Sequence, residues 1–430
     1  MYFAEVKNIV KEHHLKPLKR KIVNDPVWGF IEWDSPLLLD LISHPYVQRL
    51  RRIKQLGLSS LVYPGANHTR FEHVIGAMHL VRSALDVLKT KGHEITEEET
   101  TGVLAAILLH DIGHGPFSHA LEESMVKGIS HEVISKLFMH QLNREFDGRL
   151  DLAIQIFAGE YHKKFLHQLV SSQLDMDRLD YLKRDSFYSG VSEGIVSSDR
   201  IIKMLNIRND ELVVESKGIY SIEKFLIARR LMYWQVYMHK TVLSAEHMMI
   251  SVLKRAHELA SDGDNVFAPP ALGVFLRGDI SRHEFESGDN ETVKSALQLF
   301  AELDDTDILS SIKEWTRHSD VILSTLSRSI INRNLFKIKL SSHPVTEKKR
   351  AELRERVMKT FSVTSSEADY FVISGTATNN AYMPSVEQIN ILFKNGKIKD
   401  IKDASDINLS GLSTTVRKYF VCYPREIILK

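Results

Sequence analysis

Cysteine is almost absent from this sequence, since its 430 residues include only Cys422. One cysteine excludes a disulfide within the chain and disfavours a metal cluster held by thiolates. A metal site in this protein would therefore have to be built from histidine and carboxylate side chains. The chain has 20 histidines, so such ligands are available.

Long apolar runs and an excess of one charge are also missing. No uncharged stretch approaches the roughly 18 residues that span a membrane, and the N-terminus, MYFAEVKNIVKEHH, lacks the apolar centre of a signal peptide. The 56 lysines and arginines balance 55 aspartates and glutamates. We therefore expect a cytoplasmic protein with no membrane partner and no broad basic surface for nucleic acid.

The spacing of hydrophobic residues predicts a mainly helical chain. A small hairpin is predicted over residues 21–33, KIVNDPVWGFIEW, where β-branched and aromatic residues flank an Asn-Asp-Pro turn. Apolar residues then recur at spacings of three and four. This recurrence predicts helices over 37–56, 73–89, 100–110, 130–145, 163–183, 221–258 and 292–325.

The pattern changes near residue 330. Short segments typical of strands, LFKIKL, DYFVIS, INILF and KYFVCYP, surround the charged helical segment TEKKRAELRERVMKTF. A chain of this length exceeds the usual limit of about 250–300 residues for one hydrophobic core. We therefore predict a helical core over 1–265, a helical extension over 266–330 and an α+β C-terminal domain over 331–430.

The densest group of ligand-type side chains follows an apolar helix. In LLHDIGHGPFSHA, residues 108–120, two glycines and a proline end the helix, so the polar side chains lie on a turn at its mouth. His110 and Asp111 are neighbours, and both can reach one ion. Imidazole with carboxylate suits Mn, Fe, Zn, Ni or Mg. Three histidines and an aspartate so close together favour a functional site over surface capping.

The chain resembles the HD-domain metal-dependent phosphohydrolases, and among them the deoxynucleoside triphosphate (dNTP) triphosphohydrolases. Seven blocks carry the resemblance over about residues 20–340, in the family's order: KIVNDPVWGFIEW, HPYVQRLRRIKQLG, YPGANHTRFEHVIGAMHL, LLHDIGHGPFSHALE, DMDRLDYLKRDS, ARRLMYWQVYMHK and NRNLFK. The resemblance implies a mainly α fold, an HD-domain helical core with a small N-terminal β-hairpin and an α+β C-terminal domain. It also implies hydrolysis at the α-phosphate of a dNTP, which releases deoxynucleoside and triphosphate.

The resemblance implies one divalent metal ion, drawn from Mn, Fe, Ni, Zn and Mg, with an additional Mg on the substrate phosphates as an option. The implied metal ligands are His73, His110, Asp111 and Asp177. Asp175 and Asp180, in the same block as the last of these ligands, are expected to pair with nearby arginine or lysine.

The resemblance also implies acid–base groups on the turn and after it. The implied catalytic set is His114, His119, Glu122 and His131, with Glu122 orienting His119. Histidine supplies an acid or a base near neutral pH. Either His114 or His119 would protonate the leaving 5′-oxygen, and the sequence leaves that choice open.

Substrate contacts are implied at two further sets of positions. The phosphate contacts fall on Arg70, Arg178 and Arg229, and the sugar contacts on Gln55, Tyr181, Asp185 and Tyr237. Arg178 stands where the family usually has lysine, which keeps the charge but changes the contact geometry. In this scheme Asp185 accepts the 3′-hydroxyl proton, and a tyrosine packed on the sugar face excludes a 2′-hydroxyl.

The family often forms homo-oligomers, dimers or tetramers, with activating nucleotides at subunit junctions. The matching positions of such a second nucleotide site are Lys21, Asn24, Gln48, Arg51, Arg333 and Lys337. Ser43 replaces an aspartate that reads guanine in mammalian members, and Glu215 replaces an arginine that would meet phosphates. We expect activation by guanine nucleotides to be lost or replaced by another dNTP. Alternatively, Lys21 and Arg51 are only interface charges.

Two other functions remain open. An HD-domain phosphohydrolase acting on nucleoside monophosphates or cyclic nucleotides would use the same metal ligands. The positions that favour a dNTP over such a substrate are Arg70, Arg178, Tyr181 and Asp185. A non-catalytic nucleotide or nucleic-acid sensor is disfavoured by the near-neutral charge and by His114 and His119, because a sensor needs no acid–base groups.

Overall fold

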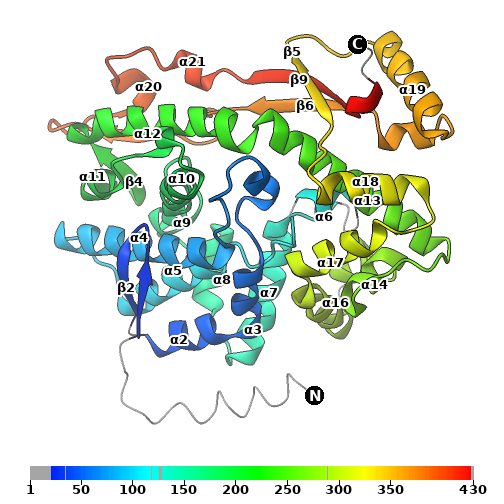
Figure 1. Cartoon of the computed structure of the whole chain (residues 1–430). Helices are drawn as coiled ribbons and strands as arrows, with labels where there is room; N and C mark the ends of the chain where they lie inside the picture. The colour runs from blue at the N-terminus through cyan, green and yellow to red at the C-terminus, as the bar shows by residue number, and fades with distance from the viewer. Residues whose placement is uncertain (1–20, 34, 118, 125–127, 288, 428–430) are drawn as a thin grey trace.

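A computed structural model describes residues 21–427, apart from residues 34, 118, 125–127 and 288. Figure 1 shows the helices of the larger part of the chain as one body, with the C-terminal strands along one side of it. Within the described part of the chain, no helix is long and apolar enough to cross a membrane.

The predicted N-terminal hairpin is confirmed. Strands β1 (Lys21–Asp25) and β2 (Gly29–Trp33) pair antiparallel, with Asp25 opposite Gly29. Asp25 Oδ1 accepts the backbone N–H groups of Val27 and Trp28, each at 2.9 Å, which closes the turn. The hairpin thus presents Trp28 and the second Asp25 oxygen to the helical core.

Three helices of the core position the site. Helix α4 (Arg70–Thr90) packs against both α5 (Glu97–Leu109) and α10 (Met176–Ser189). Helix α5 begins at a capping box made by Thr96 and Glu99, and its apolar residues are buried on all sides, as its composition predicts. Its C-terminal end therefore lies inside the protein.

Further helices complete the fold, and most of them begin or end where a polar cap or a proline interrupts the hydrophobic period. They are α2 (Pro36–Ser43), α3 (Pro45–Gln48), α6 (His119–Ser124), α7 (His131–Glu145), α8 (Asp151–Ala158), α9 (Lys164–Val170), α11 (Ser198–Lys203), α12 (Ile219–Met232), α13 (Lys240–Ser261), α14 (Pro270–Arg277), α15 (Arg282–Glu286), α16 (Asn290–Glu302), α17 (Asp305–Trp315), α18 (Val321–Ile331), α19 (Glu347–Phe361), α20 (Ile401–Ala404) and α21 (Ser410–Ser413).

Several predicted helices are divided in the structure. The 37–56 segment breaks at His44, which is extended because Pro45 follows it and starts α3. The 163–183 segment breaks before Asp175, whose carboxylate accepts the Arg178 N–H at 2.7 Å and caps α10. The segments 221–258 and 292–325 also divide, the latter into α16, α17 and α18. Hydrophobic spacing continues across such caps, so spacing alone predicted longer helices.

The strands form two larger sheets, and one of them crosses the predicted domain boundaries. Strands β5 (Lys337–Ser341), β9 (Val416–Tyr423) and β6 (Ile373–Asn379) make an antiparallel sheet. The other sheet has the order β3 (Leu205–Arg208), β4 (Glu211–Glu215), β7 (Asn390–Leu392) and β8 (Ile398–Asp400). The hairpin β3–β4 was not predicted, and β4 pairs parallel with β7. The C-terminal region is α+β as predicted, but part of it completes a sheet of the core.

Candidate active site

Three side chains from three helices converge on one point. His73 lies in α4, His110 at the end of α5, and Asp177 in the first turn of α10. Asp177 Oδ1 lies 3.0 Å from His73 Nε2 and 3.5 Å from His110 Nε2. Both nitrogens are buried and have no hydrogen-bond partner among the described residues. Buried imidazole nitrogens that face a carboxylate fit a divalent cation.

The second ring nitrogen of each of these histidines, Nδ1, is hydrogen-bonded within the protein. His73 Nδ1 lies 2.8 Å from Asp180 Oδ2, and His110 Nδ1 lies 2.6 Å from the carbonyl oxygen of Ile107. Because these acceptors require a donor, Nδ1 carries the hydrogen in both rings. In the neutral imidazole, Nε2 then keeps its lone pair toward the centre, which is the arrangement found in metal-binding histidines.

Asp180 belongs to a buried network that reaches the N-terminal hairpin. Arg184 donates two hydrogen bonds of 2.9 Å to its carboxylate, and Trp28 Nε1 donates one of 2.6 Å. Arg184 also donates to Asp25 Oδ2 at 2.8 Å. Burial raises the pKa of Asp180, but the positive charge of Arg184 outweighs it and lowers the value to about 2. A Cβ atom on Gly76 would lie 2.1 Å from Asp180 Oδ1, so this position requires glycine.

Asp111 faces several partners at once. Its Oδ2 lies 2.6 Å from Arg70 Nη1 and 3.9 Å from His73 Nε2. Its Oδ1 lies 3.4 Å from His110 Nε2 and 3.3 Å from His114 Nε2. Asp111 is therefore beside the three convergent side chains, while Asp177 occupies the position between the two histidines.

A second group forms around Asp111. The rings of His114 and His131 stack at 3.8 Å, and both can approach the same Asp111 carboxylate. Burial, together with the charge of Arg70, holds the pKa of His114 well below its usual value. His114 is therefore neutral near pH 7 and can accept a proton. His119 and Glu122 lie on α6, and their side chains are outside the described ones.

The glycine-rich turn is required by the packing of α7. A Cβ atom on Gly113 would lie 2.2 Å from the carbonyl oxygen of His131, so any larger residue would push α7 away. Ser135 of α7 accepts the Gly113 N–H at 2.9 Å and donates to the His110 carbonyl at 2.7 Å. These contacts keep His131 against His114.

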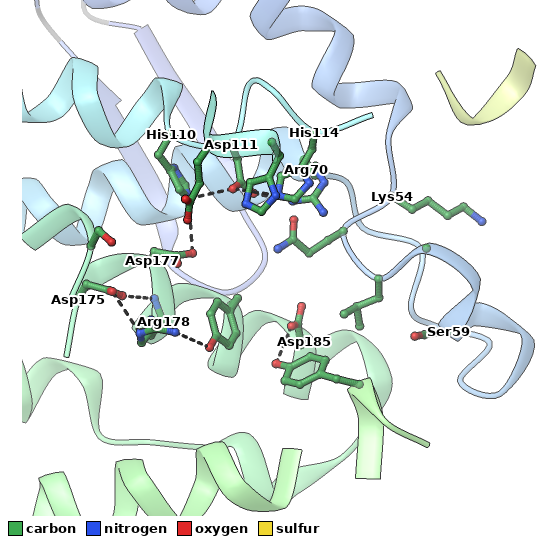
Figure 2. A pocket seen from close by; sticks show the side chains of 18 of the residues that line it. Lys54, Ser59, Arg70, His110, Asp111, His114, Asp175, Asp177, Arg178 and Asp185 are labelled. Atoms are coloured by element: carbon green, nitrogen blue, oxygen red, sulfur yellow. Dashed lines mark hydrogen bonds and ion pairs between the residues drawn. The ribbon is translucent and has the colours of Figure 1, made fainter. Parts of the chain in front are cut away.

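These groups open into one cavity of about 770 Å³. The predicted residues that line it, besides those above, are Gln55, Arg70, Arg178, Tyr181, Asp185 and Tyr237. Lining residues that the sequence did not single out include Lys54, Ser59, His167, Met238 and Glu246. In Figure 2 the histidine–aspartate cluster and Arg178 lie at one end, Lys54 and Ser59 at the other, and Asp185 between them.

Asp185 is fixed by two hydrogen bonds. Tyr237 donates its hydroxyl to Oδ2 at 2.8 Å, and His68 Nε2 lies 2.8 Å from Oδ1. The Tyr181 ring meets the Tyr237 ring edge-on, with centroids 5.9 Å apart. Burial raises the pKa of both phenols, so both hydroxyls stay protonated. His68 was part of a quoted block, but no signal in the sequence assigned it a role.

The other two predicted phosphate contacts, like Arg70, are engaged within the protein. Arg178 pairs with Asp175 at 3.2 Å, as predicted for that aspartate, and donates to the Ser172 carbonyl at 2.7 Å. Arg229 lies outside the cavity lining, and its Nη1 donates to Gln173 Oε1 at 3.3 Å. Arg178 borders the cavity and Arg229 does not, and a phosphate contact by either arginine stays a prediction.

The residues of the predicted second nucleotide site do not meet within one chain. Arg51 Nε donates a hydrogen bond of 2.9 Å to Gln48 Oε1, and the Arg51 guanidinium lies over the Phe71 ring. Arg333 donates to a carbonyl of the 57–61 turn at 2.8 Å. Figure 1 shows hairpin β1–β2, which carries Lys21 and Asn24, far from β5, which begins at Lys337. A shared site would need residues from a second copy.

The carboxylate of Glu215 is not an isolated negative charge. Lys91 Nζ lies 2.7 Å from Glu215 Oε1, and this contact lowers the pKa of Glu215. The lysine offsets the repulsion of phosphate that the sequence alone suggested for this position. Ser43 lies at the end of α2 and provides no carboxylate there.

Comparison with known proteins places this site in a family. The HD domain family matches residues 70–185, and the HD associated region matches residues 196–266. A crystal structure of a phosphohydrolase from Bacteroides thetaiotaomicron is similar, with 55% identity, a TM-score of 0.91, and coverage of 95% of this chain and 100% of that one.

Two curated relatives extend the comparison. The uncharacterized protein YwfO of Bacillus subtilis is 33% identical over 95% of this chain and 93% of its own length. The deoxynucleoside triphosphate triphosphohydrolase SAMHD1 homolog of Dictyostelium discoideum is 32% identical over 64% of this chain, which spans 57% of that protein. Together with the convergent His73, His110 and Asp177, these similarities show that the chain belongs to the HD-domain phosphohydrolases.

Proposed function

We propose that this protein is a metal-dependent dNTP triphosphohydrolase, which hydrolyses its substrate at the α-phosphate to deoxynucleoside and triphosphate. The arrangement of one cavity carries the proposal. It joins a histidine–aspartate centre to Asp185 and Tyr237, which are suited to a sugar, and it also contains Arg70 and Arg178. The name of the Dictyostelium relative supports the same substrate class.

The metal would be held by His73, His110 and Asp177, with Asp111 as the fourth ligand beside them. When bound, a divalent ion would supply Lewis acidity toward a phosphate oxygen. The candidates remain Mn, Fe, Ni, Zn and Mg, because imidazole with carboxylate suits all of them.

The side chains of the cavity supply the remaining steps. A water oxygen attacks the α-phosphorus, the bond from phosphorus to the 5′-oxygen breaks, and that oxygen receives a proton. Arg70 and Arg178 offset the negative charge of the phosphates. Either His114 or His119 would protonate the 5′-oxygen, and the other would take the proton of the attacking water.

The proposal extends to assembly and control. We propose a homo-oligomer in which residues from more than one copy form the second nucleotide site, whose members are Lys21, Asn24, Gln48, Arg51, Arg333 and Lys337. An activating nucleotide would bind there, and Ser43 would remove the carboxylate that reads guanine. Hydrolysis measured with added GTP tests this point, because clear activation at micromolar GTP would contradict it.

The first experiment is incubation of the protein with each dNTP, alone and in mixtures, with Mn²⁺ or Mg²⁺, followed by chromatography. Deoxynucleoside and triphosphate are expected from the wild type, and neither from Asp111→Ala. Diphosphate or monophosphate as the released group would contradict the proposal. Release of inorganic phosphate from a nucleoside monophosphate alone would favour the alternative HD-domain phosphohydrolase.

A further inference from the structure

His68 is a buried histidine that contacts Asp185 of the cavity lining, and the proposed mechanism does not use it. Its side chain and that of Asp185 are 0% and 1% exposed, and its Nε2 lies 2.8 Å from Asp185 Oδ1. A carboxylate only accepts hydrogen bonds, so Nε2 carries the hydrogen of this contact. His68 Nδ1 is buried without a hydrogen-bond partner among the described residues. The ring therefore makes one directed polar contact, and that contact is with Asp185.

The ring of His68 cannot turn freely. It stacks on Tyr188 with centroids 4.4 Å apart and planes 13° from parallel. The Tyr188 hydroxyl donates to Glu72 Oε1 at 2.9 Å, and the other oxygen of Glu72 accepts from Thr69 at the start of α4. The orientation of His68 is thus tied to the same helix end that carries Arg70.

Two donors hold Asp185 from opposite oxygens. His68 binds Oδ1 and the Tyr237 hydroxyl binds Oδ2, each at 2.8 Å. A carboxylate has about four acceptor positions, so two remain for a ligand in the cavity. Without His68 the carboxylate would be held at one oxygen only and could rotate about its terminal torsion, which is broad.

The backbone of His68 acts on a second residue of the same region. Its carbonyl oxygen accepts the Gln55 N–H at 3.0 Å. Gln55 also lines the cavity, and its side-chain Oε1 is buried without a hydrogen-bond partner among the described residues. His68 therefore contacts two polar residues of the cavity lining, Asp185 through its ring and Gln55 through its backbone.

We propose that His68 is a positioning residue that orients Asp185 to accept the 3′-hydroxyl of the sugar, so that the enzyme selects substrates with a free 3′-hydroxyl. This inference rests on the proposed dNTP hydrolysis. It differs from a purely structural role in one respect, because it links His68 to a single hydroxyl of the substrate.

The test compares a dNTP with the matching 2′,3′-dideoxynucleoside triphosphate (ddNTP), which lacks that hydroxyl. A hydrogen bond to a charged group contributes about 1.5–3 kcal/mol, so the wild type should prefer the dNTP by about 10-fold or more in kcat/KM. His68→Phe keeps a ring on Tyr188 but removes the donor, and this preference should then fall below about 3-fold, by loss of activity on the dNTP alone. His68→Gln returns a donor and should recover most of the preference.

Phe187→Leu is the matched control, because it changes an exposed side chain of the same helix, α10, without changing His68, Asp185 or Tyr237. Its preference for the dNTP should equal that of the wild type. Thermal unfolding and metal content are measured for each variant, and His68→Ala replaces His68→Phe if the larger ring prevents folding.

The outcomes separate the two proposals. If the wild type releases no triphosphate from any dNTP, the proposed function fails. If the wild type hydrolyses dNTP and ddNTP equally, or if a folded variant without the donor keeps the full preference, the role of His68 is wrong while dNTP hydrolysis stands.

Discussion

The histidine–aspartate end and the middle of the cavity differ in how their polar groups are satisfied. At the histidine–aspartate end, Nε2 of His73 and of His110 face Asp177 without forming hydrogen bonds among the described residues. In the middle, Asp185 is already bonded to His68 and Tyr237. The side chains of the first region could hold a cation between them, whereas the carboxylate of the second is hydrogen-bonded within the protein.

This difference indicates two kinds of preorganisation. At the metal end the rigid part is the layer behind the ligands, where Asp180 and Arg184 hold His73 from the back. In the middle of the cavity the rigid part is Asp185 itself, the residue proposed to contact the sugar. A change at the metal end should therefore abolish chemistry, whereas a change elsewhere should alter selectivity or stability.

The largest effect is expected from removal of a metal ligand. Asp177→Ala leaves His73 and His110 without the carboxylate between them, so metal affinity should collapse and hydrolysis should fall by about 10³-fold or more. Elemental analysis of the purified protein and product chromatography measure both. Asp86→Asn, which changes an exposed carboxylate on the same helix as His73, should behave as the wild type. Metal retained at the normal level in Asp177→Ala would contradict the assignment.

The layer behind the ligands should matter next. In Asp180→Asn the amide can accept from His73 Nδ1 with one atom only, and its NH₂ group opposes Arg184. Metal affinity should fall by about 10–100-fold. Competition with a chelator gives the affinity, and circular dichroism shows whether the helices persist. An unchanged metal affinity in a folded variant would contradict the idea that the layer behind the ligands preorganises the histidine–aspartate end.

A third prediction concerns the C-terminal region, which braces the cavity wall near Arg178. Glu387 accepts from Gln168 Nε2 at 2.9 Å and from the Gln173 N–H at 3.0 Å. Glu387→Ala should lower the free energy of unfolding by about 3 kcal/mol, because both donors lose a charged acceptor. Denaturant unfolding measures this change. Gln388→Ala removes the exposed neighbouring side chain and should have little effect.

The smallest effect is expected from Asp305, which holds the Lys54 end of the cavity by accepting its N–H at 3.0 Å. Burial raises the pKa of Asp305 from 3.8 to about 6. A raised pKa stabilises the folded protein below pH 4, and this stability is lost as the pH rises through 6. Between pH 4 and 6 the wild type should lose about 2 kcal/mol relative to Asp305→Asn. Denaturant unfolding of both proteins at several pH values measures this difference. If their free energies of unfolding change equally between pH 4 and pH 6, the prediction is wrong.

Much of this architecture could be predicted from local sequence. The N-terminal hairpin has its turn residues in place, and the all-apolar segment before His110 indicated a buried helix with a polar mouth. The pairing of Asp180 with an arginine could also be predicted, since Arg184 follows one helical turn later. These features depend on residues near one another in the chain.

Features that depend on distant residues could not be predicted in this way. The contact of Trp28 with Asp180 joins residues 152 positions apart, and that of His68 with Asp185 joins residues 117 apart. Strands β3 and β4 contain four and five residues, so their alternation is too short to stand out in a helical region. Their sheet is extended by the three-residue strand β7, which has even less pattern of its own.

The pairing of β4 with β7 has a consequence for synthesis on the ribosome. The edge of β4 at residues 213–215 pairs with residues 390–392, which the ribosome synthesises much later. Until then the nascent chain presents an unpaired strand edge, to which another strand could add. Incomplete chains that end before β7 should therefore be prone to aggregation. Pairing with β7 covers the exposed edge of β4 once the last part of the chain is made.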